Sequence, residues 1–290
     1  MRIAPLAEDA LAEAIRLLAS SLPHDRIEVV AAEKLFGSNG ARAGHTLGAW
    51  EGDQLVGVIA TAGRWVKLLA VAPDARRRGV ASALLDEVRT PAGKLRLFDH
   101  PGNYLSPGVD VRYAAARAFL EQRGFRALAQ VENIRAPGLD GANPLVSDER
   151  ARAAADRARS GGYQVRRAAA ADRERLLRFV EAAFAPVWAH EVARSLDGPR
   201  SAVHVAFHDE EPVAFAAADG NNRGLGWFGP AGTLPAHRGK GLGEALLLPC
   251  LLDVRGLPDA GVIAWIGPKP FYAKACGAVD DRRFAAWEEP

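Results

Sequence analysis

Cysteine is scarce in this sequence of 290 residues, which contains only two. Cys250 and Cys276 both lie in apolar segments and form no Cys-x-x-Cys pattern. This argues against the disulfide framework of a small secreted domain, and we expect a protein of the reducing cytoplasm.

Long apolar runs are also absent. A bilayer-spanning helix needs about 18 or more apolar residues, and the longest apolar run, ALLLPCLL, contains a proline and ends at Asp253. Glu8, Asp9 and Glu13 fall where a secretory signal peptide needs an uninterrupted apolar stretch. We therefore expect no association with a membrane.

An excess of one charge is missing as well. The formal net charge is +2, and no stripe of basic residues interleaved with aromatic residues is visible. An arginine-rich nucleic-acid binder is therefore a weak alternative, and we expect no nucleic-acid partner.

What the sequence does contain is an internal repeat. VAPDARRRGVASALL (Val71–Leu85) aligns with TLPAHRGKGLGEALL (Thr233–Leu247) at an offset of 162 residues. Upstream of each copy, alternating apolar residues flank a turn, at Glu51–Asp53 and at Asp209–Glu211, which predicts two hairpins. Downstream of each copy, a second helical segment leads to a glycine and a last strand.

Each half therefore reads as an α+β unit with a mixed, mostly antiparallel sheet flanked by helices. We predict an N-terminal domain at 1–138, a linker at 139–162 and a C-terminal domain at 163–290. The linker is rich in turn residues at both ends. Its middle should form a helix capped by Ser147, with Asp148 and Glu149 in the first turn.

The repeated segment places arginines and glycines directly before a helix, at Arg76–Gly79 and at Arg238–Gly241; we call these the two basic turns. A helix N-terminus has unpaired N–H groups and attracts anions, and glycine lets a ligand approach the backbone. The spacing fits neither a Walker loop nor a Rossmann fingerprint. A solvated charged turn is the alternative interpretation.

The pattern Arg-x-x-Gly-x-Gly/Ala, at Arg76–Ala81 and Arg238–Gly243, resembles the acyl-CoA motif of the GNAT acetyltransferase superfamily. The resemblance covers nearly the whole chain as two tandem units, as in mycothiol-synthase-type paired GNAT proteins. It implies that acetyl-CoA is the acyl donor. The backbone N–H groups of each basic turn and of the helix start after it would bind the pyrophosphate, and the preceding strand would bind the pantetheine arm.

The acyl-CoA-binding positions implied in the first half are Leu69, Ala70, Val71, Arg76, Arg77, Arg78, Gly79, Val80, Ala81 and Ser82. Those implied in the second half are Ala231, Gly232, Thr233, Arg238, Gly239, Lys240, Gly241, Leu242, Gly243 and Glu244.

The resemblance also implies an acid that protonates the departing thiolate, commonly a tyrosine on the helix after the motif. Tyr272 in FYAKACGAV is the candidate, although a tyrosine packed at a domain edge is the alternative. The first half has Leu120 at that position, which cannot donate a proton. We therefore expect a catalytic second half and a first half that binds CoA without turnover, unless Tyr104 or Tyr113 supplies the acid there.

No general base is evident. His190, Glu191 and Asp219 could line the acceptor side of the second half, or they could be surface residues. Asp110 could approach an acceptor in the first half, or it could be the N-cap of the next helix.

His204 and His208 lie four residues apart on one expected strand, roughly 13 Å at ~3.3 Å per residue, which is too far to chelate one ion. We expect no metal.

The sequence thus predicts an N-acyltransferase that moves an acetyl group from acetyl-CoA to a small amine acceptor. The alternative is a catalytically silent acyl-CoA sensor or scaffold, which the absence of a tyrosine at Leu120 would favour for the first half.

Overall fold

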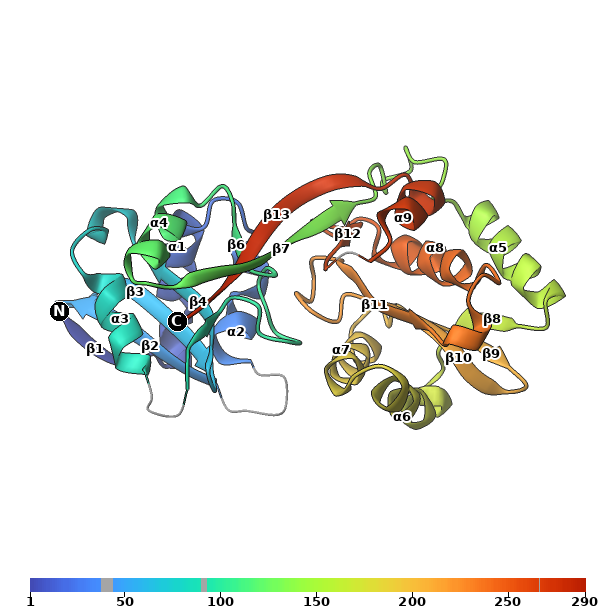
Figure 1. The fold of residues 1–290 in the computed structure, drawn as a ribbon, viewed down its shortest axis with the longest axis horizontal. Coiled ribbons are helices and arrows are strands. Elements are labelled where there is room, and N and C mark those ends of the chain that lie inside the picture. The colour runs from blue at the N-terminus through green and yellow to red at the C-terminus, as the bar shows by residue number, and fades with distance from the viewer. Residues whose placement is uncertain (38–43, 90–92, 266) are drawn as a thin grey trace. The chain divides into compact units, whose positions relative to one another are not determined.

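Helices and strands in the computed structural model follow the two halves of the repeat (Figure 1). The structure describes residues 1–37, 44–89, 93–265 and 267–290. These residues form two compact units. The first unit comprises Met1–Val131 together with Arg283–Pro290, and the second comprises Glu132–Arg282.

The first unit is one sheet with helices against it. Its helices are α1 (Leu11–Ser21), α2 (Ile27–Phe36), α3 (Val80–Val88) and α4 (Ala114–Gln122). Its strands are β1 (Arg2–Pro5), β2 (Gly44–Glu51), β3 (Gln54–Ala62), β4 (Trp65–Val71), β5 (Arg96–Leu97), β6 (Val109–Asp110) and the later residues of β13 (Val279–Glu288). They are ordered β1-β2-β3-β4-β5-β13, with β6 also paired to β13. The β4–β5 pair is parallel, and the β1–β2, β2–β3, β3–β4, β5–β13 and β6–β13 pairs are antiparallel.

The second unit repeats this plan. Its helices are α5 (Asp148–Ser160), α6 (Arg173–Ala183), α7 (Pro186–Leu196), α8 (Leu242–Val254) and α9 (Lys269–Cys276). Its strands are β8 (Gln164–Arg167), β9 (Val203–His208), β10 (Glu211–Ala218), β11 (Phe228–Thr233), β12 (Val262–Ile263) and the end of β7 (Arg126–Arg135). They are ordered β8-β9-β10-β11-β12-β7, and β11–β12 is the parallel pair. The predicted α+β class and the duplication are confirmed.

The two hairpins turn where the sequence predicts. β2 ends at Glu51 and β3 begins at Gln54, while β9 ends at His208 and β10 begins at Glu211. The first turn uses Gly52 at φ 59°, and the second uses Asp209 and Glu210 at φ 49° and 65°. Left-handed residues at a two-residue turn match the twist of the flanking strands.

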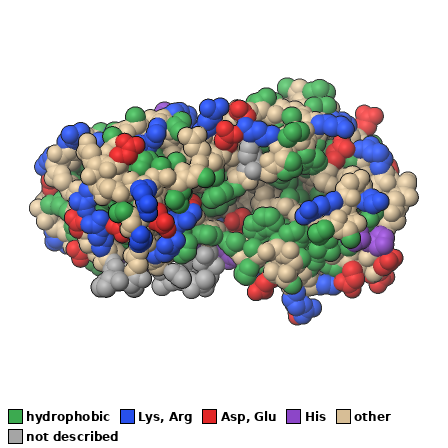
Figure 2. All heavy atoms as spheres, viewed as in Figure 1, with side chains coloured by type: hydrophobic (Ala, Val, Ile, Leu, Met, Phe, Trp, Pro, Cys, Tyr) green, Lys and Arg blue, Asp and Glu red, His purple; other side chains and the backbone are tan. Residues whose placement is uncertain are grey.

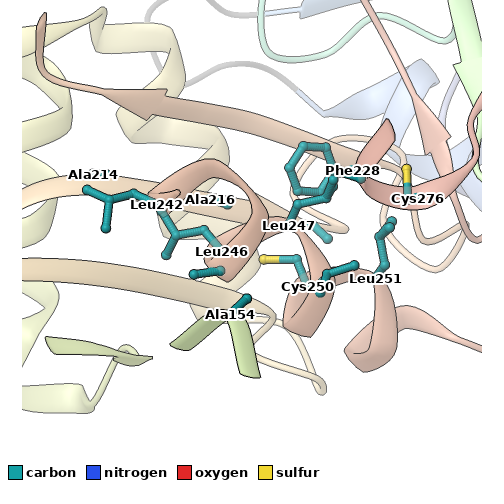
Figure 3. Packing of buried hydrophobic residues seen from close by; sticks show 14 of the residues in the cluster. Ala154, Ala214, Ala216, Phe228, Leu242, Leu246, Leu247, Cys250, Leu251 and Cys276 are labelled. Atoms are coloured by element: carbon teal, nitrogen blue, oxygen red, sulfur yellow. The ribbon is translucent and has the colours of Figure 1, made fainter. Parts of the chain in front are cut away.

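The core of the second unit is built around α8, whose leucines face several neighbours at once. Figure 3 shows Leu242, Leu246 and Leu247 of α8 packed among small side chains of β10 and α5, beside Phe228. A helix that is apolar on most of its faces is stable only when it is covered on most of them. This explains why α8 is flanked by both α5 and the sheet.

The segment predicted as a linker contains the predicted helix, α5, and the Ser147 side chain accepts a hydrogen bond from the Arg150 backbone N–H. Ala154 and Ala158 of this helix are buried in the core of the second unit. The two compact units divide elsewhere, within β7 and within β13. The helix is therefore part of the second unit, because its alanine face packs on α8.

The end of the chain belongs to the first unit. Phe284 pairs with Asp110 of β6, and Trp287 pairs with Leu97 of β5. Both aromatic side chains are buried, Trp287 with 1% of its surface exposed. The last strand therefore contributes buried core residues to the first unit, whose other residues all precede Glu132.

On the face drawn in Figure 2, Lys and Arg side chains are interspersed with Asp and Glu side chains. Within the described ranges, no helix is long and apolar enough to cross a membrane.

Candidate functional site

The basic turn of the first unit connects β4 to α3 through left-handed backbone. Arg77 has φ 63° and Gly79, the N-cap of α3, has φ 83°. Successive N–H groups in such a turn converge on one side and bind anions, and α3 adds the partial positive charge of its N-terminus. A Cβ on Gly79 would have no atom within 4 Å, so space for a ligand lies beside the backbone.

The first arginine of each basic turn has the same role in both units. The Arg76 Nε donates to the Val71 carbonyl at 3.2 Å, and the Arg238 Nε donates to the Thr233 carbonyl at 3.3 Å. Each arginine thus ties the turn to the end of the preceding strand. The arginine side chains themselves are exposed, so the solvated charged turn stays an alternative to the anion-binding interpretation.

One edge of β4 is available beside this turn. The Ala72 N–H bonds to Val56 of β3, and alternation along a strand then directs the backbone groups of Leu69 and Val71 away from β3. β4 pairs in parallel with β5 at Trp65 and Val66. Beyond that point β4 and β5 separate, and backbone N–H and C=O groups of β4 face the gap.

A cavity of about 640 Å³ occupies this gap. Leu69 to Val71 of β4, the basic turn and the start of α3 line one side of it. Phe119 and Leu120 of α4 also line it, together with the loop between α1 and α2. The cavity therefore brings together every segment that the sequence assigned to acyl-CoA in the first half.

Several polar residues of the cavity wall were not predicted. His24 and Asp25 come from the loop between α1 and α2, Lys67 from β4, and Arg112 from the segment before α4. A loop between two helices gives no sequence signal for such a role. The lysine inside the apolar strand WVKLLAV was a visible signal that the sequence reasoning passed over.

Asp110, a predicted acceptor-side residue, lines the cavity and is buried. Both of its carboxylate oxygens accept hydrogen bonds from the Arg112 guanidinium, the shortest at 2.6 Å, and one also accepts the Arg112 backbone N–H at 2.8 Å. The N-cap of α4 is Tyr113. The alternative interpretation, in which Asp110 is the N-cap of α4, is therefore wrong.

Tyr113 is held over the loop between α1 and α2. Its hydroxyl donates to the Asp25 carboxylate at 2.7 Å and accepts the His24 backbone N–H at 3.1 Å. Leu120 is buried in the cavity wall, and Tyr104 is buried without lining the cavity among the described residues. Of the two tyrosines named as substitutes for an acid at position 120, Tyr113 alone reaches the cavity.

Lys67 is the extra residue of a bulge in β4, because Leu68 pairs with Ala60 and Val66 pairs with the next residue, Thr61. Only 1% of its surface is exposed. Its Nζ donates to the Gly37 carbonyl at 2.5 Å. Burial and, less strongly, the nearby ammonium of Lys34 lower the pKa of Lys67 to about 8, while Glu33 opposes the change.

This lysine predicts a pH dependence of folding. Between pH 8 and 10.5 the unfolded chain binds the proton that the folded chain has lost, so the free energy of unfolding rises with pH. We expect Lys67→Met to remove this rise and to stabilise the protein at pH 7 by about 2 kcal/mol, after the lost hydrogen bond is counted. Denaturant unfolding at pH 7 and pH 10, with exposed Lys94→Met as the control, measures both effects. An unchanged slope in Lys67→Met would contradict the assignment.

The second basic turn has the same backbone. Gly239 and Gly241 have φ 75° and 79°, and the position of Gly239 corresponds to the non-glycine residue Arg77. Glu244 in the first turn of α8 pairs with Arg150 at 2.7 Å and with Arg157 at 3.0 Å, both from α5. The ring of Phe271 lies 3.0 Å from the place where a Cβ on Gly243 would stand, so α9 packs closely on the start of α8.

Tyr272, the predicted acid, lies on α9 beside aromatic rings. Its ring centroid is 4.9 Å from that of Phe271 and 6.2 Å from that of Phe228. Burial and, less strongly, the nearby Cys276 raise the pKa of Tyr272 to about 12. The assignment of Tyr272 as an acid stays a prediction.

The other predicted acceptor-side residues of the second unit lie near one another. Glu191 is buried in α7, and its carbonyl oxygen lies 2.3 Å from the place of a Cβ on Gly220, next to Asp219. One Asp219 oxygen accepts the N–H groups of Gly224 and Gly226 at 2.8 and 2.9 Å. Burial raises the pKa of Asp219, although these two hydrogen bonds oppose the increase. Asp219 therefore organises the loop that leads to β11, and His190 lies beside Glu191 on α7.

The two histidines of β9 have separate partners. His204 pairs with Asp253 at 2.8 Å, and His208 pairs with Asp209 at 3.2 Å. Among the described residues, no group of three or more His, Cys, Asp or Glu side chains is arranged to hold a metal ion.

Each half of the chain matches a protein-family model. One acetyltransferase (GNAT) domain model matches residues 42–127, and an acetyltransferase (GNAT) family model matches residues 162–277. The search of curated proteins found no match.

Solved structures resemble the whole chain. A GCN5-related glucosamine N-acetyltransferase region of a fungal multi-domain GH3 β-N-acetylglucosaminidase aligns with TM-score 0.74 and 18% identity over 99% of this chain. The chain spans 38% of the length of that fungal protein. A GCN5-related N-acetyltransferase from Sphaerobacter thermophilus (TM-score 0.66, 15% identity) is covered over 95% of its length. A tandem GNAT protein from the clavulanic acid biosynthesis pathway (TM-score 0.65, 19% identity) is covered over 97% of its length. Both alignments cover 99% of this chain. These similarities concern the fold.

Proposed function

The chain belongs to the GNAT acetyltransferase superfamily, with two such domains in tandem, and on this premise we propose that it transfers the acetyl group of acetyl-CoA to the amine of a small acceptor in the first unit. The observation that carries the proposal is the 640 Å³ cavity, which joins the basic turn, the open edge of β4 and the polar groups of the loop between α1 and α2. This differs from the sequence-based expectation, which put the chemistry in the second unit at Tyr272.

The backbone of the first unit would bind the donor. N–H groups from Arg77 to Ser82 would accept the pyrophosphate, because the left-handed turn and the α3 dipole both favour an anion there. Backbone groups of Leu69 and the N–H of Val71 would pair with the amides of the pantetheine arm, since the Val71 carbonyl already accepts from Arg76 and Ser21. An N–H on the same edge of β4 would stabilise the oxyanion that forms when the amine attacks the thioester.

The side chains near the loop between α1 and α2 suggest a route for the proton. The acceptor amine would lose a proton to Asp25, and Tyr113 would pass its hydroxyl proton to the departing thiolate while it takes one from Asp25. The 2.7 Å hydrogen bond between Tyr113 and Asp25 supports this relay. Leu120 would serve only to pack against the acyl arm.

A thermal shift tests donor binding. A ligand that binds only the folded state stabilises it by RT ln(1 + [L]/Kd), about 2.7 kcal/mol at 100 times Kd. We therefore expect acetyl-CoA to raise the melting temperature of this protein. A melting curve that millimolar acetyl-CoA leaves unchanged would remove the CoA assignment altogether.

Release of free CoA over a panel of amines separates an enzyme from a silent sensor, the second candidate. The sensor would bind acetyl-CoA and release none. If an amine in the panel accelerates the release of CoA, the protein is a transferase.

We also propose that the protein acts in the cytoplasm. Its two cysteines are free and buried, which supports a reducing compartment.

Two tyrosine variants decide between the units. We expect Tyr113→Phe to lower kcat by about 10²-fold with little change in KM for acetyl-CoA, because only the proton donor is lost. Tyr272→Phe should leave turnover near the parental value. The reverse result, with the loss in Tyr272→Phe alone, would return the chemistry to the second unit.

A further inference from the structure

The second unit has an aromatic side chain at a position where the first unit has a leucine. Phe184 corresponds to Leu22 at the repeat offset of 162 residues. Each is the C-cap of the helix that follows the first strand of its unit, Leu22 after α1 and Phe184 after α6. Each donates its backbone N–H to the carbonyl four residues earlier, at 2.8 and 3.1 Å. The two side chains therefore leave the chain at equivalent places.

The strand residue on this side of the sheet also differs between the units. It is Ala70 in β4 and Gly232 in β11, at the same offset. Both residues lie four positions beyond the parallel pair of their unit, which forms at Val66 and at Phe228. In the first unit, Ala70 and the leucine after α1 both line the 640 Å³ cavity. The corresponding pair of the second unit therefore marks where its acyl-CoA groove would run.

In the second unit the ring of Phe184 fills this place. Its Cε1 atom lies 2.4 Å from where a Cβ on Gly232 would stand, and its Cζ atom lies 2.7 Å from it. The ring thus rests directly on the backbone of β11, which is the kind of close approach that requires a glycine in a strand. The alanine of β4 could not stand at position 232 while the ring is there.

Other aromatic rings hold Phe184 in this position. Trp188 of α7 is stacked on it, with ring centroids 5.6 Å apart and an angle of 21° between the planes. Phe179 and Phe215 contact it edge to face, at 5.7 and 5.4 Å. Phe215 is fully buried and pairs with Gly232 across β10 and β11, on the face of the sheet that α6 and α7 cover (Figure 1). Stacked and edge-to-face contacts together favour one orientation of the ring.

We propose that Phe184 closes the acyl-CoA groove of the second unit, so that the protein binds acyl-CoA in the first unit alone. The inference rests on the proposed binding of acyl-CoA by the first unit. An arm that starts at the second basic turn and follows β11 would meet the ring at Gly232. The second unit then keeps a basic turn for the pyrophosphate, while the ring stands where the arm and its thioester need room.

Titration calorimetry with acetyl-CoA counts the binding sites. We expect one site per chain in the parent and two in Phe184→Leu, because leucine is the residue that borders the open cavity in the first unit. Adding Gly241→Glu to Phe184→Leu should remove the new site, since the carboxylate would stand where the pyrophosphate binds. Phe179→Leu is the matched control. It removes a ring of the same cluster that is not among the atoms nearest to Gly232, and it should keep one site.

Gly232→Ala tests the position of the ring without any ligand. The added Cβ would collide with Phe184, and forcing an extra carbon into a packed site destabilises a fold. We therefore expect a lower melting temperature for the second unit. In Phe184→Leu the same change should cost little, because the double variant reproduces the pair Leu22 and Ala70 of the first unit. The difference between the two backgrounds measures the coupling between positions 184 and 232.

Four results would overturn the closure of the second unit. These are two sites in the parent, a parental site that Gly241→Glu removes, a single site in Phe184→Leu that still melts cooperatively, or an equal cost of Gly232→Ala in both backgrounds. The first two need no change at position 184. If the parent binds no acetyl-CoA, the proposed function fails. A site gained in Phe184→Leu and lost on adding Gly241→Glu would still support closure in that case.

Discussion

Replacing Gly79 by glutamate is expected to abolish acyl-CoA binding and turnover in the first unit. The new carboxylate would stand at the start of α3, where the proposal puts the pyrophosphate. Like charges brought together in a binding site cost several kcal/mol, and each 1.4 kcal/mol is a factor of ten in affinity. The loss should therefore exceed roughly 100-fold. Titration calorimetry with acetyl-CoA and an assay of released CoA measure the two effects.

The second basic turn offers a matched control. Gly241 has φ 79°, close to the 83° of Gly79, and a Cβ at either position would have no atom within 4 Å. Gly241→Glu therefore carries the same backbone strain and charge but should preserve turnover. Gly79→Ala carries the strain alone and separates it from the charge. Parental turnover in Gly79→Glu would exclude the first unit from the reaction.

The second large effect concerns the last strand. Trp287→Ala should destabilise the first unit by about 3–5 kcal/mol, since a large side chain leaves a cavity where it was almost fully buried. The melting of a protein with two units need not be a single transition. We expect the transition of the first unit to move to lower temperature, as calorimetry can record.

The same substitution should weaken acetyl-CoA binding. β13 pairs with β6, and β6 contributes Val109 and Asp110 to the cavity. Trp287→Phe keeps an aromatic ring in place and serves as the control, with a smaller loss of stability. If Trp287→Ala melts like the parent, the last strand is not part of the core of the first unit.

Local patterns explain why much of this fold could be predicted. The hairpin turns at Gly52 and at Asp209–Glu210 depend on a few adjacent residues, and so does the helix capped by Ser147. The repeat of the basic turn strengthened the assignment, because two copies in the same strand–helix context are hard to explain by chance. These features depend on contacts between residues close in sequence.

The features that the sequence did not reveal depend on distant contacts. The bulge at Lys67 is visible only when β3 and β4 are paired, and the contact of Tyr113 with Asp25 joins residues 88 positions apart. The pairing of Trp287 with Leu97 joins the chain's last strand to a unit that otherwise ends before Glu132. Neither periodicity nor composition indicates such a partner.

The position of this last strand has a consequence for synthesis on the ribosome. Residues 283–288 are made only after all of residues 132–282, which takes about 8–30 s at 5–20 residues per second. During that time the nascent first unit lacks Phe284 and Trp287, and β5 and β6 present backbone groups that β13 will later pair. Exposed strand edges are sites of aggregation. The first unit should therefore depend on chaperone protection during translation, although most of it is made before the second unit.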